Sequence, residues 1–72
     1  MNLTHGTEEE HIATLKRAHA AKLSSIWSGD LRNRYLSENL DYAVEKGIIE
    51  LEPYDSPSAQ ESGYTITWLR AP

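Results

Sequence analysis

The sequence predicts an α+β domain in which two main helices are followed by a two-stranded antiparallel hairpin. Two observations predict this fold class. Apolar residues recur at helical spacing as far as Gly47, and beyond it apolar and polar residues alternate as they do in strands. A third helix forms if residues 30–35 separate from the second. The length of 72 residues accommodates one small domain, which we expect to span residues 7–72.

The first helix is predicted to run from about Glu8 to Trp27. Thr7 and Glu10 have the spacing of a capping box, in which each side chain accepts a hydrogen bond from the backbone N–H of the other residue. One helical face then carries an apolar stripe, made of Ile12, Leu15, His19, Leu23, Ile26 and Trp27. Residues 1–6, ahead of the cap, are expected to form a flexible tail.

The second helical region, residues 30–46, has two interpretations. Either a short helix and a turn precede a main helix whose N-cap is Ser37, or one helix runs continuously from Asp30 to Lys46. We favour the continuous helix because no glycine or proline interrupts it. In both interpretations Gly47 ends the helix in a left-handed conformation. The buried face then carries Leu36, Leu40, Ala43 and Val44.

The last third of the chain is predicted to form the hairpin. In the first strand Ile49 and Leu51 alternate with two glutamates, and Pro53 ends the strand or marks it as a sheet edge. The second strand alternates more regularly, with one face formed by Tyr64, Ile66 and Trp68 and the other by Thr65 and Thr67. Residues 53–63 are expected to form an eleven-residue polar loop between the two strands.

Composition and spacing argue against a catalytic or metal-binding protein. The chain has no cysteine, which excludes disulfides and thiolate sites. His5, His11 and His19 lack the i, i+4 spacing that places two imidazoles on one helix face for a metal. We interpret His19 as a partly buried, hydrogen-bonded packing residue. Since neither a Ser/His/Asp arrangement nor a glycine-rich phosphate loop is present, we expect no enzyme activity, no metal and no cofactor.

Hydropathy and charge bear on location and on partners. The chain has no run of about 18 apolar residues and no basic-then-apolar N-terminus, so we expect a cytoplasmic protein without a membrane span or secretory signal. Its net charge is −4 and is unevenly placed. From His11 to Arg34 five residues are basic and one is acidic, whereas from Ile48 to Gly63 four are acidic and none is basic.

The order of elements around Gly47 resembles that of a known family. A helix, the segment Glu45-Lys46-Gly47-Ile48-Ile49 and two strands around a polar loop resemble the closing half of a winged helix-turn-helix domain. In that family the helix before the glycine enters the major groove of DNA, and the loop between the strands contacts the backbone or the minor groove. The resemblance therefore implies a DNA-binding regulatory protein, a transcription regulator.

The resemblance also implies which residues contact DNA. Those on or before the reading helix are Arg32, Asn33, Arg34, Ser37 and Asn39. Lys16 and Arg17 would extend a basic patch if the two helices bring them close to the arginines. The loop that corresponds to the wing departs from a DNA-binding pattern, because it contains acidic residues and neither arginine nor lysine.

The alternative is a small acidic protein-interaction module or inhibitor, of the kind that phages and mobile elements encode. It would bind a basic host protein or mimic nucleic acid. The candidate contacts are the acidic residues of the hairpin together with tyrosines, namely Glu50, Glu52, Asp55, Tyr35, Tyr42 and Tyr54. A homodimer is a further option, since Leu31, Tyr35 and Tyr42 point away from the predicted core face.

Overall fold

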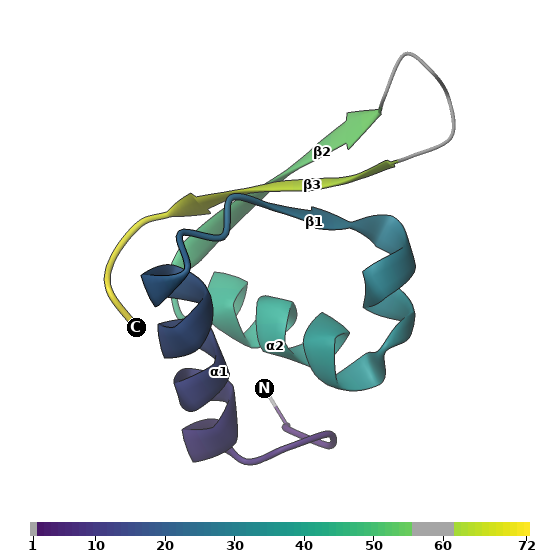
Figure 1. Ribbon diagram of the computed structural model, residues 1–72. Coiled ribbons are helices and arrows are strands. Elements are labelled where there is room, and N and C mark those ends of the chain that lie inside the picture. Colours follow the sequence, from purple (N-terminus) through teal and green to yellow (C-terminus); the bar gives the residue numbers. More distant parts are fainter. Residues whose placement is uncertain (1, 56–61) are drawn as a thin grey trace.

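The computed structural model describes residues 2–55 and 62–72, and within them two α-helices pack on a three-stranded antiparallel sheet (Figure 1). The predicted fold class, α+β, is therefore confirmed, whereas the prediction of two strands is wrong. In chain order the elements are α1 (Glu8–Ala20), β1 (Ser25–Trp27), the 3₁₀ helix η1 (Ser28–Arg32), α2 (Arg34–Glu45), β2 (Ile49–Asp55) and β3 (Ser62–Trp68). The strand order in the sheet is β1-β3-β2.

The start of α1 is as predicted, but its end is not. Thr7 and Glu10 form both hydrogen bonds of the capping box, each 3.1 Å long. The helix stops at Ala20, seven residues before the predicted end at Trp27, and Lys22 adopts a left-handed conformation with φ 56°. The residues that were expected to continue the helix instead lead into β1.

The strand that was not predicted, β1, forms because the free edge of β3 offers backbone hydrogen bonds to the segment after α1. Ser25 pairs with Thr65, and Trp27 pairs with Gly63. Isoleucine and tryptophan fit a strand well, and the serines before them are weak helix formers, so pairing with β3 overrides the helical spacing. Gly63 permits this pairing, because a Cβ at that position would clash with the backbone oxygen of Ile26.

The helix α2 begins at neither of the predicted positions. Asn33 has an extended backbone, and its side-chain oxygen accepts hydrogen bonds from the backbone N–H groups of Tyr35 and Leu36, at 2.9 and 3.3 Å. Asn33 is thus the N-cap, and the predicted cap at Ser37 is wrong. The continuous helix from Asp30 is also wrong, since η1 is a separate helical segment. The predicted end is confirmed, with Gly47 at φ +70°.

The hairpin of β2 and β3 has the predicted alternation but longer strands. The register runs from Ile49 opposite Trp68 to Asp55 opposite Ser62. Pro53 lies within β2 rather than at its end, which is tolerated because β2 is an edge strand of the sheet. The predicted loop of residues 53–63 is therefore too long at both ends, and its centre, residues 56–61, lies outside the described residues.

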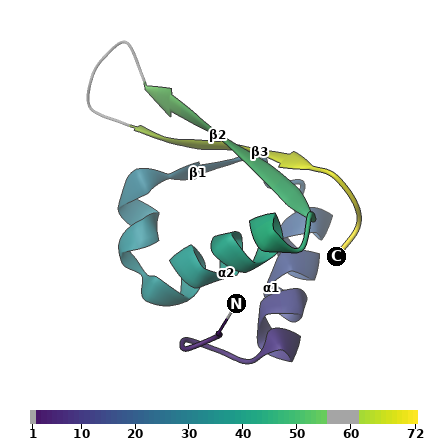
Figure 2. The same cartoon turned by 180° about the vertical axis from the view of Figure 1, so that it is seen from behind.

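Both helices cover the same face of the sheet, and the core lies between them (Figures 1 and 2). Its buried apolar residues are Leu15, Leu40, Tyr42, Ala43, Ile48, Ile49 and Ile66. Among the large apolar residues predicted for the core, three are exposed, namely Leu23, Trp27 and Val44. The first two follow the end of α1, and Val44 lies outside the buried arc of α2, which extends instead towards Asn39 and Tyr42. Neither helix described here has the length and apolarity to cross a membrane.

Candidate functional site

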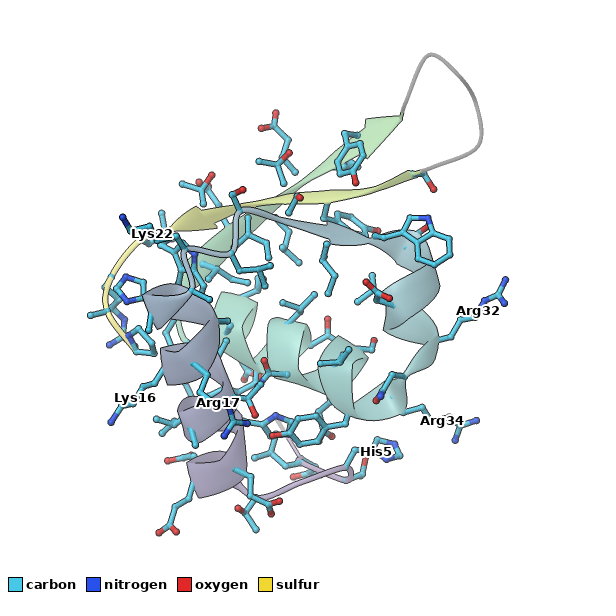
Figure 3. All side chains as sticks on the ribbon, viewed as in Figure 1. His5, Lys16, Arg17, Lys22, Arg32 and Arg34 are labelled. Carbon is cyan, nitrogen blue, oxygen red and sulfur yellow. The ribbon has the colours of Figure 1, made fainter. Side chains whose placement is uncertain are left out.

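The basic residues fall into two separate groups (Figure 3). Arg32 and Arg34 project from η1 and from the start of α2, whereas Lys16 and Lys22 project from α1 and the segment after it, on the opposite side of the molecule. Arg17 donates a hydrogen bond to the hydroxyl of Thr14, three residues earlier on α1, at 3.3 Å. The structure therefore does not unite the arginines and lysines in one patch.

The exposed side of α2 carries Arg34, Ser37 and Asp41, which recur at helical spacing. Arg34 and Asp41 are exposed and Ser37 is half-buried. Together with His5, Leu31 and the edge of the largely buried Glu38, these residues line a shallow hollow beside the helix. Within the part of the chain that the structure describes, the side chains of Arg34 and Asp41 have no hydrogen-bond or ion-pair partner.

Two of the asparagines and serines predicted to contact DNA serve the fold, at least in part. Asn39 is only 4% exposed, and its amide nitrogen lies 3.0 Å from both the backbone oxygen and Nδ1 of His11. Its side chain is therefore engaged within the fold, and contact with DNA would require these hydrogen bonds to break. Asn33 is exposed, but its side-chain oxygen caps α2. Arg32, Arg34 and Ser37 remain as surface candidates on this side.

A buried polar cluster lies behind α2, centred on His11, which is fully buried. Its Nε2 lies 2.8 Å from Oε2 of Glu38, and its ring stacks on Tyr35 and Tyr42 with centroids 4.7 and 5.8 Å away. Because the Asn39 amide donates to Nδ1, this nitrogen accepts, and the ring proton belongs on Nε2, from where it is donated to Glu38.

The Glu38 carboxylate joins this cluster to the segment before α1. It accepts hydrogen bonds from the backbone N–H groups of Thr4 and His5, at 2.6 and 2.8 Å, and from the Thr4 hydroxyl at 3.1 Å. The Thr4 N–H is the main cause that lowers the pKa of Glu38 to about 2, with burial opposing it and His11 and the His5 N–H adding to it. Thr4 and His5 belong to the segment expected to form a flexible tail, and the sequence did not predict these contacts.

The histidine predicted to be a packing residue was the wrong one. His19 is exposed and makes only an edge contact with the Trp68 ring, at 5.0 Å between centroids. His11 fills that role instead. Its spacing of four residues from the buried Leu15 was a signal that it lies on the inner face of α1. Its polar partners Glu38 and Asn39 are 27 and 28 residues away, so no local sequence pattern predicts these contacts.

The residues proposed for protein contact also separate into two sets. Tyr42 is buried, and burial, more than the neighbouring Glu8 carboxylate, raises its pKa. Tyr35 donates its hydroxyl proton to the backbone oxygen of Glu10 at 3.0 Å, so both tyrosines serve the fold. Glu50 and Glu52 are exposed on β2, and Tyr54 is half-buried there. Asp55 ends β2 opposite Ser62.

No group of three or more histidine, aspartate and glutamate side chains suited to a metal ion occurs in residues 2–55 and 62–72. Comparison of the chain with family models, with curated proteins and with solved structures gives no match.

Proposed function

We propose that this protein is a small winged-helix-like DNA-binding regulator that contacts DNA through η1 and the N-terminal half of α2. The observation that carries the proposal is the separate helical segment η1. The resemblance drawn from the sequence covered only the helix before Gly47 and the hairpin, and it lacked a helix ahead of the turn. With η1 and the turn at Asn33, the described residues contain a helix-turn-helix-like order followed by a hairpin.

A side-chain contact ties η1 to the loop end of the hairpin. The hydroxyls of Ser28 and Ser62 lie 3.0 Å apart, so the first residue of η1 is held at the first residue of β3. Arg32 and Arg34 project from the side of the molecule on which β2 ends and β3 begins (Figures 1 and 3). The winged-helix proposal requires a duplex to contact both α2 and this end of the hairpin.

The charges on this side predict weak, salt-sensitive binding. Two arginines neutralise about two phosphates, and each phosphate neutralised contributes about −0.9 to the slope of log affinity against log salt. Asp41 and Glu45 lie further along the same side of α2, and they repel the DNA backbone there. Contact should therefore centre on Arg32, Arg34 and Ser37, at the start of the helix.

Fluorescence anisotropy with a labelled random-sequence duplex at about 50 mM salt tests the proposal. We expect the wild type to bind, the double variant Arg32→Ala/Arg34→Ala to lose most of its affinity, and Lys16→Ala to retain it. Lys16 is the matched control, because it removes a cation from the opposite side. Absence of wild-type binding, or an equal loss in both variants, would contradict DNA binding by this surface.

A second function, binding to a basic protein, is favoured by one observation on β2. Glu50 and Glu52 are exposed on the same face of this edge strand, and their cross-strand neighbours are Thr67 and Thr65 rather than cations. In this case affinity purification should recover a stoichiometric partner with the wild type and with Arg32→Ala/Arg34→Ala. Glu50→Lys/Glu52→Lys should recover none, and recovery by this variant would exclude the acidic face as the interface.

A further inference from the structure

The core contains a cavity of about 110 Å³ that lies between the helices and the sheet. Its apolar lining comes from both helices and all three strands, and includes Leu15, Ala18, Leu36, Leu40, Ile66 and Trp68. The proposed function makes no use of this cavity, since the residues proposed to contact DNA lie on η1 and on the outer side of α2. An unfilled volume in a domain of 72 residues is costly, because its lining atoms lack partners on one side.

The polar groups in the lining leave little for water to bind. Thr14 and Asn39 are the polar residues there, and both already have partners within the protein. The Thr14 hydroxyl lies 2.7 Å from the Tyr35 hydroxyl, and the Asn39 amide bonds His11. In the described part of the chain no buried side-chain nitrogen or oxygen lacks a hydrogen-bond partner. A water molecule, which needs two to four polar partners, is therefore a poor occupant.

One wall of the cavity is formed where the segment after α1 meets β3. Leu23 and Trp68 both line the cavity, and the Trp68 indole N–H donates a hydrogen bond to the Leu23 backbone oxygen at 2.7 Å. Leu23 is 38% exposed and belongs to the short connection between α1 and β1. This wall is therefore exposed to solvent at Leu23.

We propose that this cavity is a binding site for a compact, uncharged apolar molecule. Cavities of about 150 Å³ lined by aliphatic and aromatic side chains stay dry and bind benzene or xenon. The volume of about 110 Å³ is smaller, so xenon enters directly and a single unsubstituted ring enters with displacement of Leu23. A charged or strongly hydrogen-bonding ligand is excluded, because it would leave its own polar groups without partners.

Methyl NMR of the full chain under xenon pressure and during titration with benzene tests the site. We expect saturable shifts of the Leu15, Leu40 and Ile66 methyl groups and of the Trp68 indole N–H. The exposed methyl groups of Leu69 and Val44 are internal controls and should not shift. Shifts that do not saturate, or that are equally large at the control methyl groups, would overturn the proposal.

Two variants on α1 separate filling of the cavity from a general effect of a larger side chain. Ala18→Leu places a side chain in the cavity and should abolish the saturable shifts. Ala13→Leu adds the same side chain to the exposed side of the same helix and should leave them unchanged. If Ala18→Leu does not fold, Leu36→Ala enlarges the cavity from α2 and should bind benzene more tightly. Unchanged or weaker benzene binding in that folded variant would contradict the proposal.

Discussion

The inner and outer sides of α2 carry similar polar residues that have opposite roles. On the inner side Glu38 and Asn39 are buried and hydrogen-bonded within the protein. On the outer side Arg34 and Asp41 are exposed, and among the described residues neither side chain has a partner. Residue type alone does not distinguish the two sides. What distinguishes them is the segment of chain that covers the inner side, and this difference separates residues that stabilise the fold from residues that are available to a ligand.

The largest difference should appear between two apolar residues of α2. Leu40→Ala on the inner side removes buried methyl groups and should lower the free energy of unfolding by about 2–5 kcal/mol. Val44→Ala on the exposed side should change it by no more than about 0.5 kcal/mol. Urea unfolding followed by circular dichroism measures both. Equal effects would mean that the two sides of α2 are not distinct.

The buried amide should have the next largest effect. Asn39→Ala leaves the His11 backbone oxygen and ring nitrogen without their donor, which should cost about 1–3 kcal/mol. Asp41→Ala removes a polar group from the outer side and should cost at most about 0.5 kcal/mol. The same unfolding assay checks the pair. An Asn39→Ala variant as stable as the wild type would show that its hydrogen bonds to His11 contribute nothing to stability.

The loss of stability at acidic pH should involve Glu38 on the inner side of α2. The pKa of Glu38 is lowered from 4.5 to about 2 in the folded protein, so its carboxylate contributes stability above pH 4.5. That contribution is lost as the pH falls from 4.5 towards 2. Unfolding measured from pH 6 to pH 2 should therefore become less pH-dependent in Glu38→Gln, and remain as in the wild type in the exposed control Asp41→Asn. An unchanged profile in Glu38→Gln would contradict the assigned network.

The smallest effect on stability is expected at the residue proposed to contact DNA. Arg34→Ala should change the free energy of unfolding by no more than about 0.5 kcal/mol. If DNA is the ligand, the same variant should reduce the slope of log affinity against log salt by about 1. Anisotropy titrations at several salt concentrations measure this slope. A destabilised Arg34→Ala variant would place this arginine among the structural residues instead.

The features that could be predicted from the sequence are those specified by neighbouring residues. The capping box of Thr7 and Glu10, the left-handed Gly47 and the alternation around Ile49 and Ile66 depend on spacings of a few residues, and all are present. Strand β1 depends instead on pairing with β3, about forty residues further along the chain. The local spacing of apolar residues in this segment favours a helix. It forms a strand only because it pairs with β3 in the folded protein.

In the candidate site, the sequence allowed the exposure of the arginines to be predicted but not the burial of Asn39. Arginines such as Arg32 and Arg34 are seldom buried without a partner, so their exposure follows from their type. Asn39 could have lain on either side of α2, because an amide is stable in water and equally stable when its hydrogen bonds are satisfied in the core. Its partner His11 belongs to another helix, and no local pattern connects the two.

At His5 the backbone and the side chain have separate roles, because only the backbone N–H takes part in the anchoring to Glu38. Thr4 and His5 each present a main-chain N–H to the carboxylate, and the His5 contribution needs no particular side chain. The His5 imidazole is exposed and lines the hollow beside Arg34. Replacement of His5 by lysine, glutamine or glutamate would therefore retune the electrostatic potential beside this arginine while the backbone attachment stays intact. The side chain at position 5 thus sets the charge beside Arg34 independently of how the first residues are attached.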